Sequence, residues 1–260
     1  MEEQINVERL FNLEGKVALV TGSSGGLGKI LAEGLAINKA HVILNGRSKD
    51  KIEKTFREFR AKGYAVSRAV FDVTKSEEIS SAVASLVDET GTPDIIVNNA
   101  GINPRYPLEE FPEEEWDAVI NTNLKSAFLV SKAFVKAMMM KRSGKIINIC
   151  SLQSELGRNT IAPYAASKGG LKMLTRNMAT EWAQHNIQVN GIAPGYFKTD
   201  MTKPLYEDPE FDTWLKNRTP ASRWGDPTEL LGALFFLASD ASSFINGQLI
   251  FVDGGITAAI

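Results

Sequence analysis

Short runs of apolar and β-branched residues recur along this chain, and segments long enough for helices separate them. Several runs have a continuously apolar centre, such as "IIV" in "DIIVNN" and "VALV" in "KVALVT", which is typical of strands covered on both faces of a parallel sheet. Strands are expected at residues 16–21, 41–45, 64–71, 94–99, 144–150, 187–193 and 247–253. Helices are expected at residues 27–38, 49–61, 76–90, 113–141, 163–185 and 226–239. This alternation predicts an α/β fold with one doubly wound parallel sheet of about seven strands and helices on both faces.

One stretch, 194–225, departs from this alternation. It contains four prolines, has no clear period, and is unusually long for a loop in a compact domain. Its aromatic residues favour burial, so we expect a substrate-binding lid here and not a disordered insert. The 260 residues contain no repeat, low-complexity tract or linker, and residues 1–260 are therefore predicted to form a single domain.

Charge and composition argue against several classes of partner. Lys and Arg number 29 against 31 Asp and Glu, so no basic excess indicates a nucleic-acid binder. Apolar runs such as Leu230–Ala238 are shorter than the roughly 20 residues of a membrane span. The two histidines give no metal-ligand pattern, and no metal is expected. The N-terminus lacks the apolar core of a signal peptide, and the single cysteine, Cys150, favours a reducing setting, so we expect a cytoplasmic protein.

A glycine-rich turn, "VTGSSGGLGKI", follows the first strand and opens the first long helix. Gly22, Gly26 and Gly28 allow a tight turn and a close approach of a pyrophosphate to the helix N-terminus, where free N–H groups favour anions. Glycines also mark plain turns. The position at the first strand-to-helix junction nevertheless predicts a dinucleotide-binding loop.

The end of the second strand, "ILNGRSKD", indicates which dinucleotide binds. An acidic residue there would accept hydrogen bonds from a free ribose 2′-hydroxyl, but this chain has neutral Asn45 followed by Arg47. A guanidinium can hold a 2′-phosphate through paired hydrogen bonds. The sequence therefore favours NADP(H) over NAD(H), although Arg47 as a solvated loop residue is the alternative.

The stretch "PYAASKGG" places Tyr164 and Lys168 one helical turn apart, on the same face. A nearby ammonium would lower the pKa of the phenol and prepare it for proton transfer. Ser151 follows the fifth strand, at the edge where open α/β sheets bind ligands, and its hydroxyl can orient a substrate oxygen. Gly169 and Gly170 are unfavourable inside a helix and indicate close packing against another backbone, such as that of a second subunit.

Together these motifs resemble the short-chain dehydrogenases/reductases. The resemblance rests on "TGSSGGLG", "DV" at 72–73, "NNAG" at 98–101, "NTNL" with Asn123, Ser151, "YAASK", and "PG" at 194–195 followed by Thr199. It implies a Rossmann-type fold, a homotetramer, and a catalytic set of Asn123, Ser151, Tyr164 and Lys168. The implied cofactor contacts are Gly22, Ser24, Gly26, Leu27, Gly28, Arg47, Asp72, Val73, Asn98, Ala100, Gly101, Tyr164, Lys168, Pro194, Gly195 and Thr199.

The segments around the expected pocket indicate the class of substrate. "NNAGINPRYPLEEFPEEEW" and "RTPASRWGDPTEL" are similar to those of family members that interconvert a sugar acid and its keto form. A sugar acid needs a cation for its carboxylate, and Arg105 and Arg158 are the candidates, alongside Ser151 and Tyr164. Glu155 would accept hydroxyl hydrogen bonds or fix an arginine, and Lys203, Arg218 and Arg223 are further cations in or after the lid. Three alternatives stay open: a 3-oxoacyl carrier-protein thioester, another keto sugar acid, or a catalytically silent dinucleotide-binding scaffold.

Overall fold

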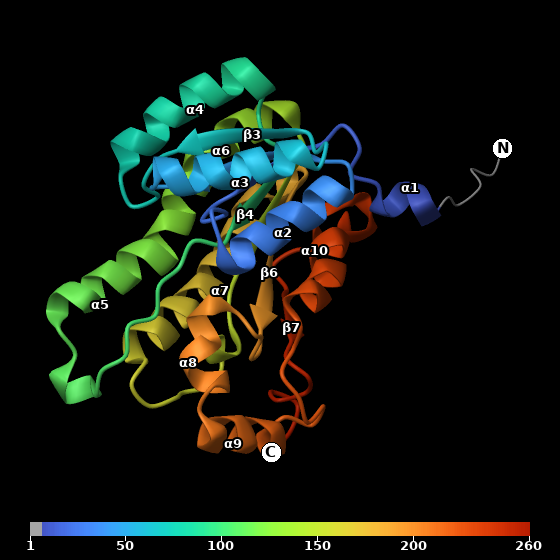
Figure 1. Ribbon diagram of the computed structural model, residues 1–260. Coiled ribbons are helices and arrows are strands. Elements are labelled where there is room, and N and C mark those ends of the chain that lie inside the picture. The colour runs from blue at the N-terminus through green and yellow to red at the C-terminus, as the bar shows by residue number, and fades with distance from the viewer. Residues whose placement is uncertain (1–6) are drawn as a thin grey trace.

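Seven parallel strands form a single sheet in the order β3-β2-β1-β4-β5-β6-β7 (Figure 1). The computed structural model describes residues 7–260, so the first six residues of the N-terminal stretch considered above lie outside it. The strands are β1 (Val17–Val20), β2 (His41–Gly46), β3 (Val66–Val70), β4 (Ile95–Asn98), β5 (Gly144–Ile149), β6 (Ile187–Pro194) and β7 (Leu249–Val252). Every predicted strand is present, and each neighbouring pair is parallel.

Helices cover both faces of the sheet, as the sequence predicted. The helices are α1 (Val7–Phe11), α2 (Gly26–Ile37), α3 (Lys49–Ala61), α4 (Ser76–Thr90), α5 (Glu113–Ile120), α6 (Ser126–Lys141), α7 (Ala162–Trp182), α8 (Lys203–Tyr206), α9 (Pro209–Arg218) and α10 (Leu231–Ala238). Residues of α2, α3 and α10 pack on one face, and residues of α4, α6 and α7 pack on the other. The single-domain, doubly wound Rossmann-type fold is therefore confirmed.

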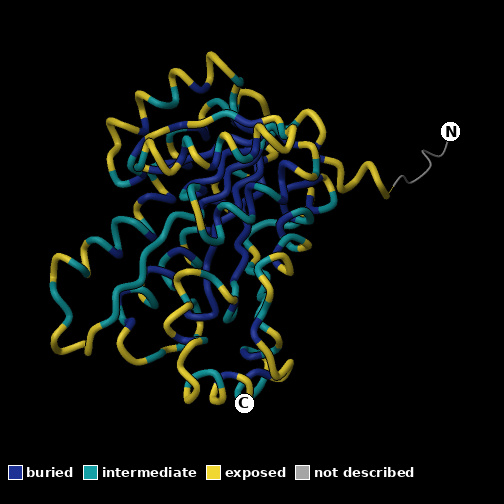
Figure 2. The backbone as a smooth tube through the Cα atoms, viewed as in Figure 1, coloured by how far each residue is buried: buried dark blue, intermediate teal, exposed yellow. Residues whose placement is uncertain are grey.

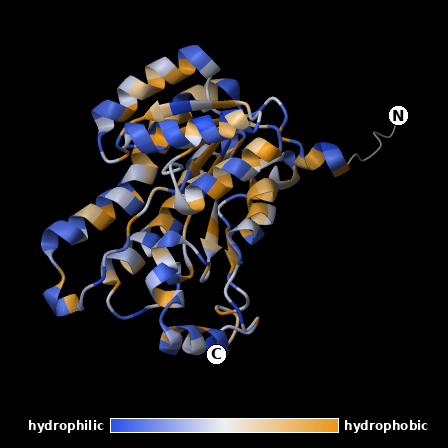
Figure 3. Ribbon diagram, in the orientation of Figure 1, coloured by the Kyte–Doolittle hydropathy of each residue, from blue (hydrophilic) through white to orange (hydrophobic). Residues whose placement is uncertain are grey.

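The strands supply both hydrophobic cores because successive side chains point to opposite faces. In β1, Ala18 and Val20 join the core beneath α2, whereas Leu19 joins the core beneath α6. The buried residues consequently lie along the sheet, and the outer surfaces of the helices are exposed (Figure 2). Hydropathy follows the same division, with apolar strands and polar outer faces on α3 and α4 (Figure 3).

The long helix predicted over 113–141 is interrupted. Its middle forms a π-helical turn, Asn121–Lys125, between α5 and α6. The side chain of Asn123 bonds the backbone of Ile102 twice, accepting from its N–H at 2.8 Å and donating to its carbonyl at 2.9 Å. Such turns insert one extra residue into a helix and commonly occur at functional sites.

The predicted lid is folded into short helices. Pro204 and Pro209 occupy the first turns of α8 and α9. Proline is tolerated there because a backbone N–H in the first turn has no partner within the helix. These helices lie beyond the end of β6 in Figure 1. Two of the four prolines that obscured a period in the sequence are therefore helix starts.

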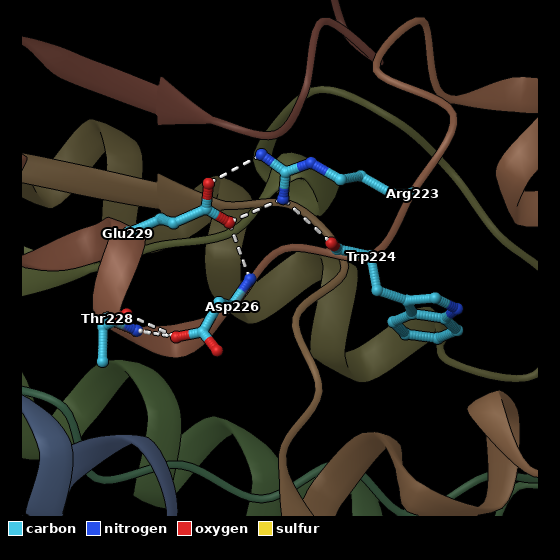
Figure 4. A network of polar contacts seen from close by, with 5 residues as sticks. All are labelled: Arg223, Trp224, Asp226, Thr228 and Glu229. Atoms are coloured by element: carbon cyan, nitrogen blue, oxygen red, sulfur yellow. Dashed lines mark hydrogen bonds and ion pairs between the residues drawn. The ribbon is translucent and has the colours of Figure 1, made fainter.

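The base of the lid is held together by several polar contacts. Phe197 and Gly225 form an isolated parallel bridge. Arg223 makes a two-point ion pair with Glu229, with both N···O distances 2.7 Å, and also donates to the carbonyl of Trp224 at 3.1 Å (Figure 4). Asp226 caps the following turn by accepting from the backbone N–H of Thr228 at 2.9 Å.

Within residues 7–260, no helix is both long and apolar enough to cross a bilayer. In the same range, no three His, Cys, Asp or Glu side chains are grouped so that they could hold a metal ion.

Candidate active site

A pocket of about 410 Å³ lies at the carboxyl edge of the sheet, where the strand order reverses between β1 and β4. In open α/β sheets this reversal point is where ligands bind. Eighteen of the twenty residues expected at the site line it: Gly22, Ser24, Gly26, Leu27, Gly28, Arg47, Asp72, Val73, Ala100, Gly101, Arg105, Ser151, Arg158, Tyr164, Lys168, Pro194, Gly195 and Thr199. Asn98 and Asn123 are the two that do not.

The glycine loop forms a cradle that larger residues cannot make. Gly22 and Gly26 have φ of +64° and +53°, the left-handed region that favours glycine. A Cβ on Gly28 would lie 2.3 Å from the carbonyl oxygen of Gly22, so a side chain there would collide with backbone. The cradle opens at the N-terminus of α2, and it fits the phosphates of a dinucleotide.

Asn45 has a structural role that its sequence position did not reveal. Its side chain is fully buried; Oδ1 accepts from the backbone N–H of Gly22 at 3.4 Å, and Nδ2 donates to the carbonyls of Ala69 and Phe71 at 3.2 Å each. Asn45 therefore joins the glycine loop to the end of β3.

Arg47 lies beside the cradle, on the pocket wall, and is exposed. Burial opposes ionisation of Asp72, but hydrogen bonds from Thr74 and the positive charge of Arg47 outweigh it and hold the pKa of Asp72 below its usual value. No carboxylate in residues 7–260 forms an ion pair with Arg47, and its guanidinium is available to a ligand.

Ser151, Tyr164 and Lys168 converge on the opposite side of the pocket. Ser151 caps the 3-10 turn Leu152–Ser154, accepting from the N–H of Gln153 at 3.2 Å, and also hydrogen-bonds the Gln153 side chain. The ammonium of Lys168 donates to the carbonyl of Ile149 at 2.6 Å and lies 5.6 Å from the centre of the Tyr164 ring. The i,i+4 spacing thus places both groups in the same corner of the pocket.

The protonation of this pair differs from the sequence-based expectation. Burial raises the pKa of Tyr164, although a hydrogen bond with Ser151 opposes the shift, and burial lowers the pKa of Lys168 to about 8. For the protein alone, the net lowering of the Tyr164 pKa expected from the sequence is not found, because burial dominates. Low-dielectric surroundings favour the neutral form of both groups. A neutral phenol at pH 7 is a proton donor, which suits a general acid.

Asn123 lies behind the pocket and touches the catalytic helix. Its Nδ2 donates to Ser167 Oγ at 3.2 Å, and this hydroxyl donates to the carbonyl of Tyr164 at 2.7 Å. The π-helical turn thereby connects the segment at Ile102 with the first turn of α7. Gly170 allows this contact, since a Cβ there would lie 2.8 Å from the Leu124 side chain.

Asn98 was expected beside the cofactor ribose, but its side chain lies within the protein interior. Its Nδ2 donates to Asn148 Oδ1 at 2.8 Å and to Ser131 Oγ at 3.1 Å. The next residue, Asn99, lines the pocket instead and donates to the carbonyl of Thr21 at 2.9 Å. The two asparagines have different surroundings because successive residues at the end of β4 point in opposite directions.

Two guanidinium groups share the substrate end of the pocket. Arg105 and Arg158 both line it, and burial followed by the positive charge of Arg158 lowers the pKa of Arg105. Across the described chain, neither arginine is within ion-pair distance of a carboxylate. Two unneutralised cations facing one cavity favour an anionic ligand.

The other charged side chains considered for the substrate site form contacts outside the pocket. Glu155 is paired with Lys172 and does not line the pocket. Lys203 pairs with Glu207 at 3.7 Å, and Arg218 donates to the carbonyl of Ala259 at 3.3 Å. With Arg223 held by Glu229, these side chains are not part of the site.

Comparison with known proteins agrees with this geometry. The sequence profile described as short chain dehydrogenase matches residues 16–210. The 5-keto-D-gluconate 5-reductase of Escherichia coli (strain K12) is 54% identical over 251 residues, covering 96% of this chain and 99% of that protein. This chain belongs to the short-chain dehydrogenase family. It is therefore an oxidoreductase, and the family expectation from its motifs is confirmed.

Two further members of the family are similar over nearly the whole chain. The 2-dehydro-3-deoxy-D-gluconate 5-dehydrogenase of Formosa agariphila is 51% identical, covering 96% of each chain. A crystal structure of a gluconate 5-dehydrogenase from Burkholderia cenocepacia J2315, in complex with NADP and tartrate, is 48% identical with a TM-score of 0.96, covering 98% of this chain and 100% of that one.

This short-chain dehydrogenase has pocket residues that the sequence did not single out. Asn99, Asn103 and Tyr196 line the cavity, and the only available signal was their closeness to recognised motifs. Gln153, two residues after Ser151, also lines the pocket, and its side chain hydrogen-bonds the Ser151 hydroxyl. A loop position alone does not tell which side chains turn inward.

Proposed function

We propose that this oxidoreductase interconverts D-gluconate and 5-keto-D-gluconate with NADP(H) as its cofactor. The observation that carries the proposal is the pair of guanidiniums, Arg105 and Arg158, in the pocket that also contains Ser151 and Tyr164. A sugar acid brings a carboxylate to the cations and a ketone or hydroxyl to the proton-transfer groups. Relatives about half identical to this chain carry the corresponding names, and one was solved with NADP and the hydroxy acid tartrate.

The proposed roles follow from the geometry. When bound, the cofactor supplies a hydride to the ketone or accepts one from the alcohol. Tyr164 then gives a proton to the developing alkoxide oxygen in reduction, and its phenolate takes the proton back in oxidation. Ser151 orients the reacting oxygen, while Lys168 adds a positive charge that stabilises the phenolate. Asn123 holds the first turn of α7, which carries Tyr164.

Arg47 is proposed to bind the 2′-phosphate of NADP(H). Arg47→Ala should raise the KM for NADPH by about 10- to 100-fold, the range of a lost charge-assisted hydrogen bond, and change the KM for NADH by less than about twofold. Steady-state kinetics with each cofactor measures both values. Lys51→Ala is a matched control, because Lys51 is an exposed cation on α3 that does not line the pocket. Equal increases in the KM for NADPH and for NADH would show that Arg47 does not bind the 2′-phosphate.

A second keto sugar acid is the strongest alternative substrate. The Formosa agariphila relative is named for oxidation of 2-dehydro-3-deoxy-D-gluconate at carbon 5. Gluconate and this compound share a carboxylate at carbon 1 and a reacting carbon 5, so the same arginine pair would serve either. Comparing kcat/KM for 5-keto-D-gluconate and for uncharged D-fructose tests whether the carboxylate is recognised. We expect the charged substrate to be favoured by about 100-fold, the loss associated with charge-assisted hydrogen bonds.

We also propose that the enzyme works as a homotetramer. Gly169 on α7 has no atom within 4 Å of the point where a Cβ would lie, and Met173 on the same helix is 50% exposed. Phe128 on α6 is 41% exposed. An open glycine beside exposed apolar side chains suits close approach of a second subunit. The mass in solution, measured by light scattering, tests this assembly.

The proposed setting is the cytoplasm. Its support is Cys150, which is buried beside the pocket and unpaired, as expected in a reducing compartment. Burial raises the pKa of the Cys150 thiol to about 11, so it stays protonated and unreactive. Fractionation of the native cells would test the location.

A further inference from the structure

Arg158 is held by aromatic side chains of the lid and not by a carboxylate. Its guanidinium carbon lies 4.5 Å from the centre of the Phe211 ring and 5.8 Å from the centre of the Tyr196 ring. Its Nη1 also donates to the hydroxyl of Tyr196 at 3.4 Å. A guanidinium within about 6 Å of a ring centre is attracted to the ring face. Phe211 makes the closer of these two ring contacts.

Phe211 is itself fixed by the fold of the lid. It lies in the first turn of α9, where the side chain of Asp208 accepts from the N–H groups of Glu210 and Phe211 at 3.0 and 3.4 Å. Its ring packs against Trp214, with centres 5.1 Å apart, and against Trp224 at 6.3 Å. The place of Phe211 therefore depends on α9 being seated.

The segment that carries Arg158 is tied to the segment that carries Arg105. The N–H of Tyr106 donates to the carbonyl of Thr160 at 3.1 Å. Both guanidiniums line one pocket, and after burial the positive charge of Arg158 is the second cause that lowers the pKa of Arg105, so the two cations repel each other. Because no carboxylate of the described chain neutralises them, repulsion would turn the half-buried Arg158 outward unless another group held it.

We propose that Phe211 is a positioning residue for Arg158, and that it makes recognition of the substrate carboxylate depend on the seating of α9. The inference rests on the proposed sugar-acid substrate. It assigns the lid a part in choosing the substrate, because an uncharged ketose gains nothing from an ordered Arg158. The anion site is complete only when the lid helix lies over it.

The test compares a charged and an uncharged substrate in lid variants. Phe211→Leu should raise the KM for 5-keto-D-gluconate by about fivefold or more, the value of a desolvated cation–π contact, and leave the KM values for D-fructose and NADPH within about twofold. Phe211→Tyr keeps the ring and should restore the wild-type KM. Tyr206→Leu is the matched control, since Tyr206 belongs to the same aromatic cluster but makes no ring contact with Phe211 or Arg158.

A double mutant separates positioning from general damage to the lid. In an Arg158→Gln background, Phe211→Leu should have no further effect on the KM for 5-keto-D-gluconate, since the group that it positions is already gone. Equal KM increases for charged and uncharged ketoses, or additive effects of the two substitutions, would overturn the inference. If the wild-type enzyme shows no preference for the charged substrate, the proposed substrate fails instead.

Discussion

Tyr164→Phe is expected to lower kcat for ketone reduction by about 10³-fold or more, near the upper part of the range for general acid catalysis. The substitution removes only the hydroxyl, and burial keeps that hydroxyl protonated at neutral pH by raising the Tyr164 pKa. The hydroxyl of Ser151 interacts with this phenol and opposes part of the pKa shift. The dissociation constant for NADPH, measured by fluorescence, should change by less than about twofold, since the ring that lines the pocket is retained.

Tyr206→Phe provides a control for this experiment. Tyr206 packs on Trp224 within the lid, with ring centres 5.9 Å apart, and does not line the pocket. Its replacement should leave kcat nearly unchanged. If Tyr164→Phe kept most of the wild-type kcat, Tyr164 would not be the proton donor.

The second large effect concerns Lys168. Lys168→Met should lower kcat/KM for reduction by about 10²-fold or more, a typical loss for a preorganised charge next to the reacting group. Burial lowers the Lys168 pKa to about 8, so the ammonium is present at pH 7 and is lost as the pH rises through about 8. We therefore expect kcat/KM of the wild-type enzyme to fall above about pH 8, and the variant to lack this step.

Lys168→Met is expected to lower activity but to raise the stability of the fold. Between about pH 8 and the ordinary lysine pKa, Lys168 binds fewer protons in the folded protein than in the unfolded chain. Its destabilising effect is therefore fully present below about pH 8 and is relieved as the pH rises above that value. Methionine has no charge to bury. Lys168→Met should raise Tm at pH 7 while removing activity, and a variant that loses both would indicate a structural role only.

Much of the architecture could be predicted because hydrophobic periodicity depends on local sequence. Predominantly apolar runs such as Ile95–Asn98 and Gly144–Ile149 are strands buried on both faces, and the glycines of the cofactor loop adopt positive φ angles that follow from the local sequence. The π-helical turn at Asn123 was not predictable, because it depends on a contact with Ile102, a residue 21 positions away. The lid helices were hidden by prolines that mark their first turns.

The candidate site shows the same limit. The sequence placed residues at strand ends on the correct edge of the sheet, but it did not show which side chains point into the pocket. Asn98 was expected there, and Asn99 lines the pocket instead. The pKa of Tyr164 was misjudged because a charge one turn away is visible in sequence, whereas burial is not. Arg105 and Arg158 are 53 positions apart, and only the fold places them at one pocket.

We propose that this oxidoreductase acts on carbon 5 of a sugar acid. The most direct test is the initial rate of NADPH oxidation by the wild-type enzyme with 5-keto-D-gluconate, 2-keto-D-gluconate and an acetoacetyl thioester. We predict that kcat/KM for 5-keto-D-gluconate exceeds that for either other compound by about 100-fold, because only it presents the carboxylate and the ketone with the required spacing. Equal rates on all three compounds, or a preference for the thioester, would contradict the account.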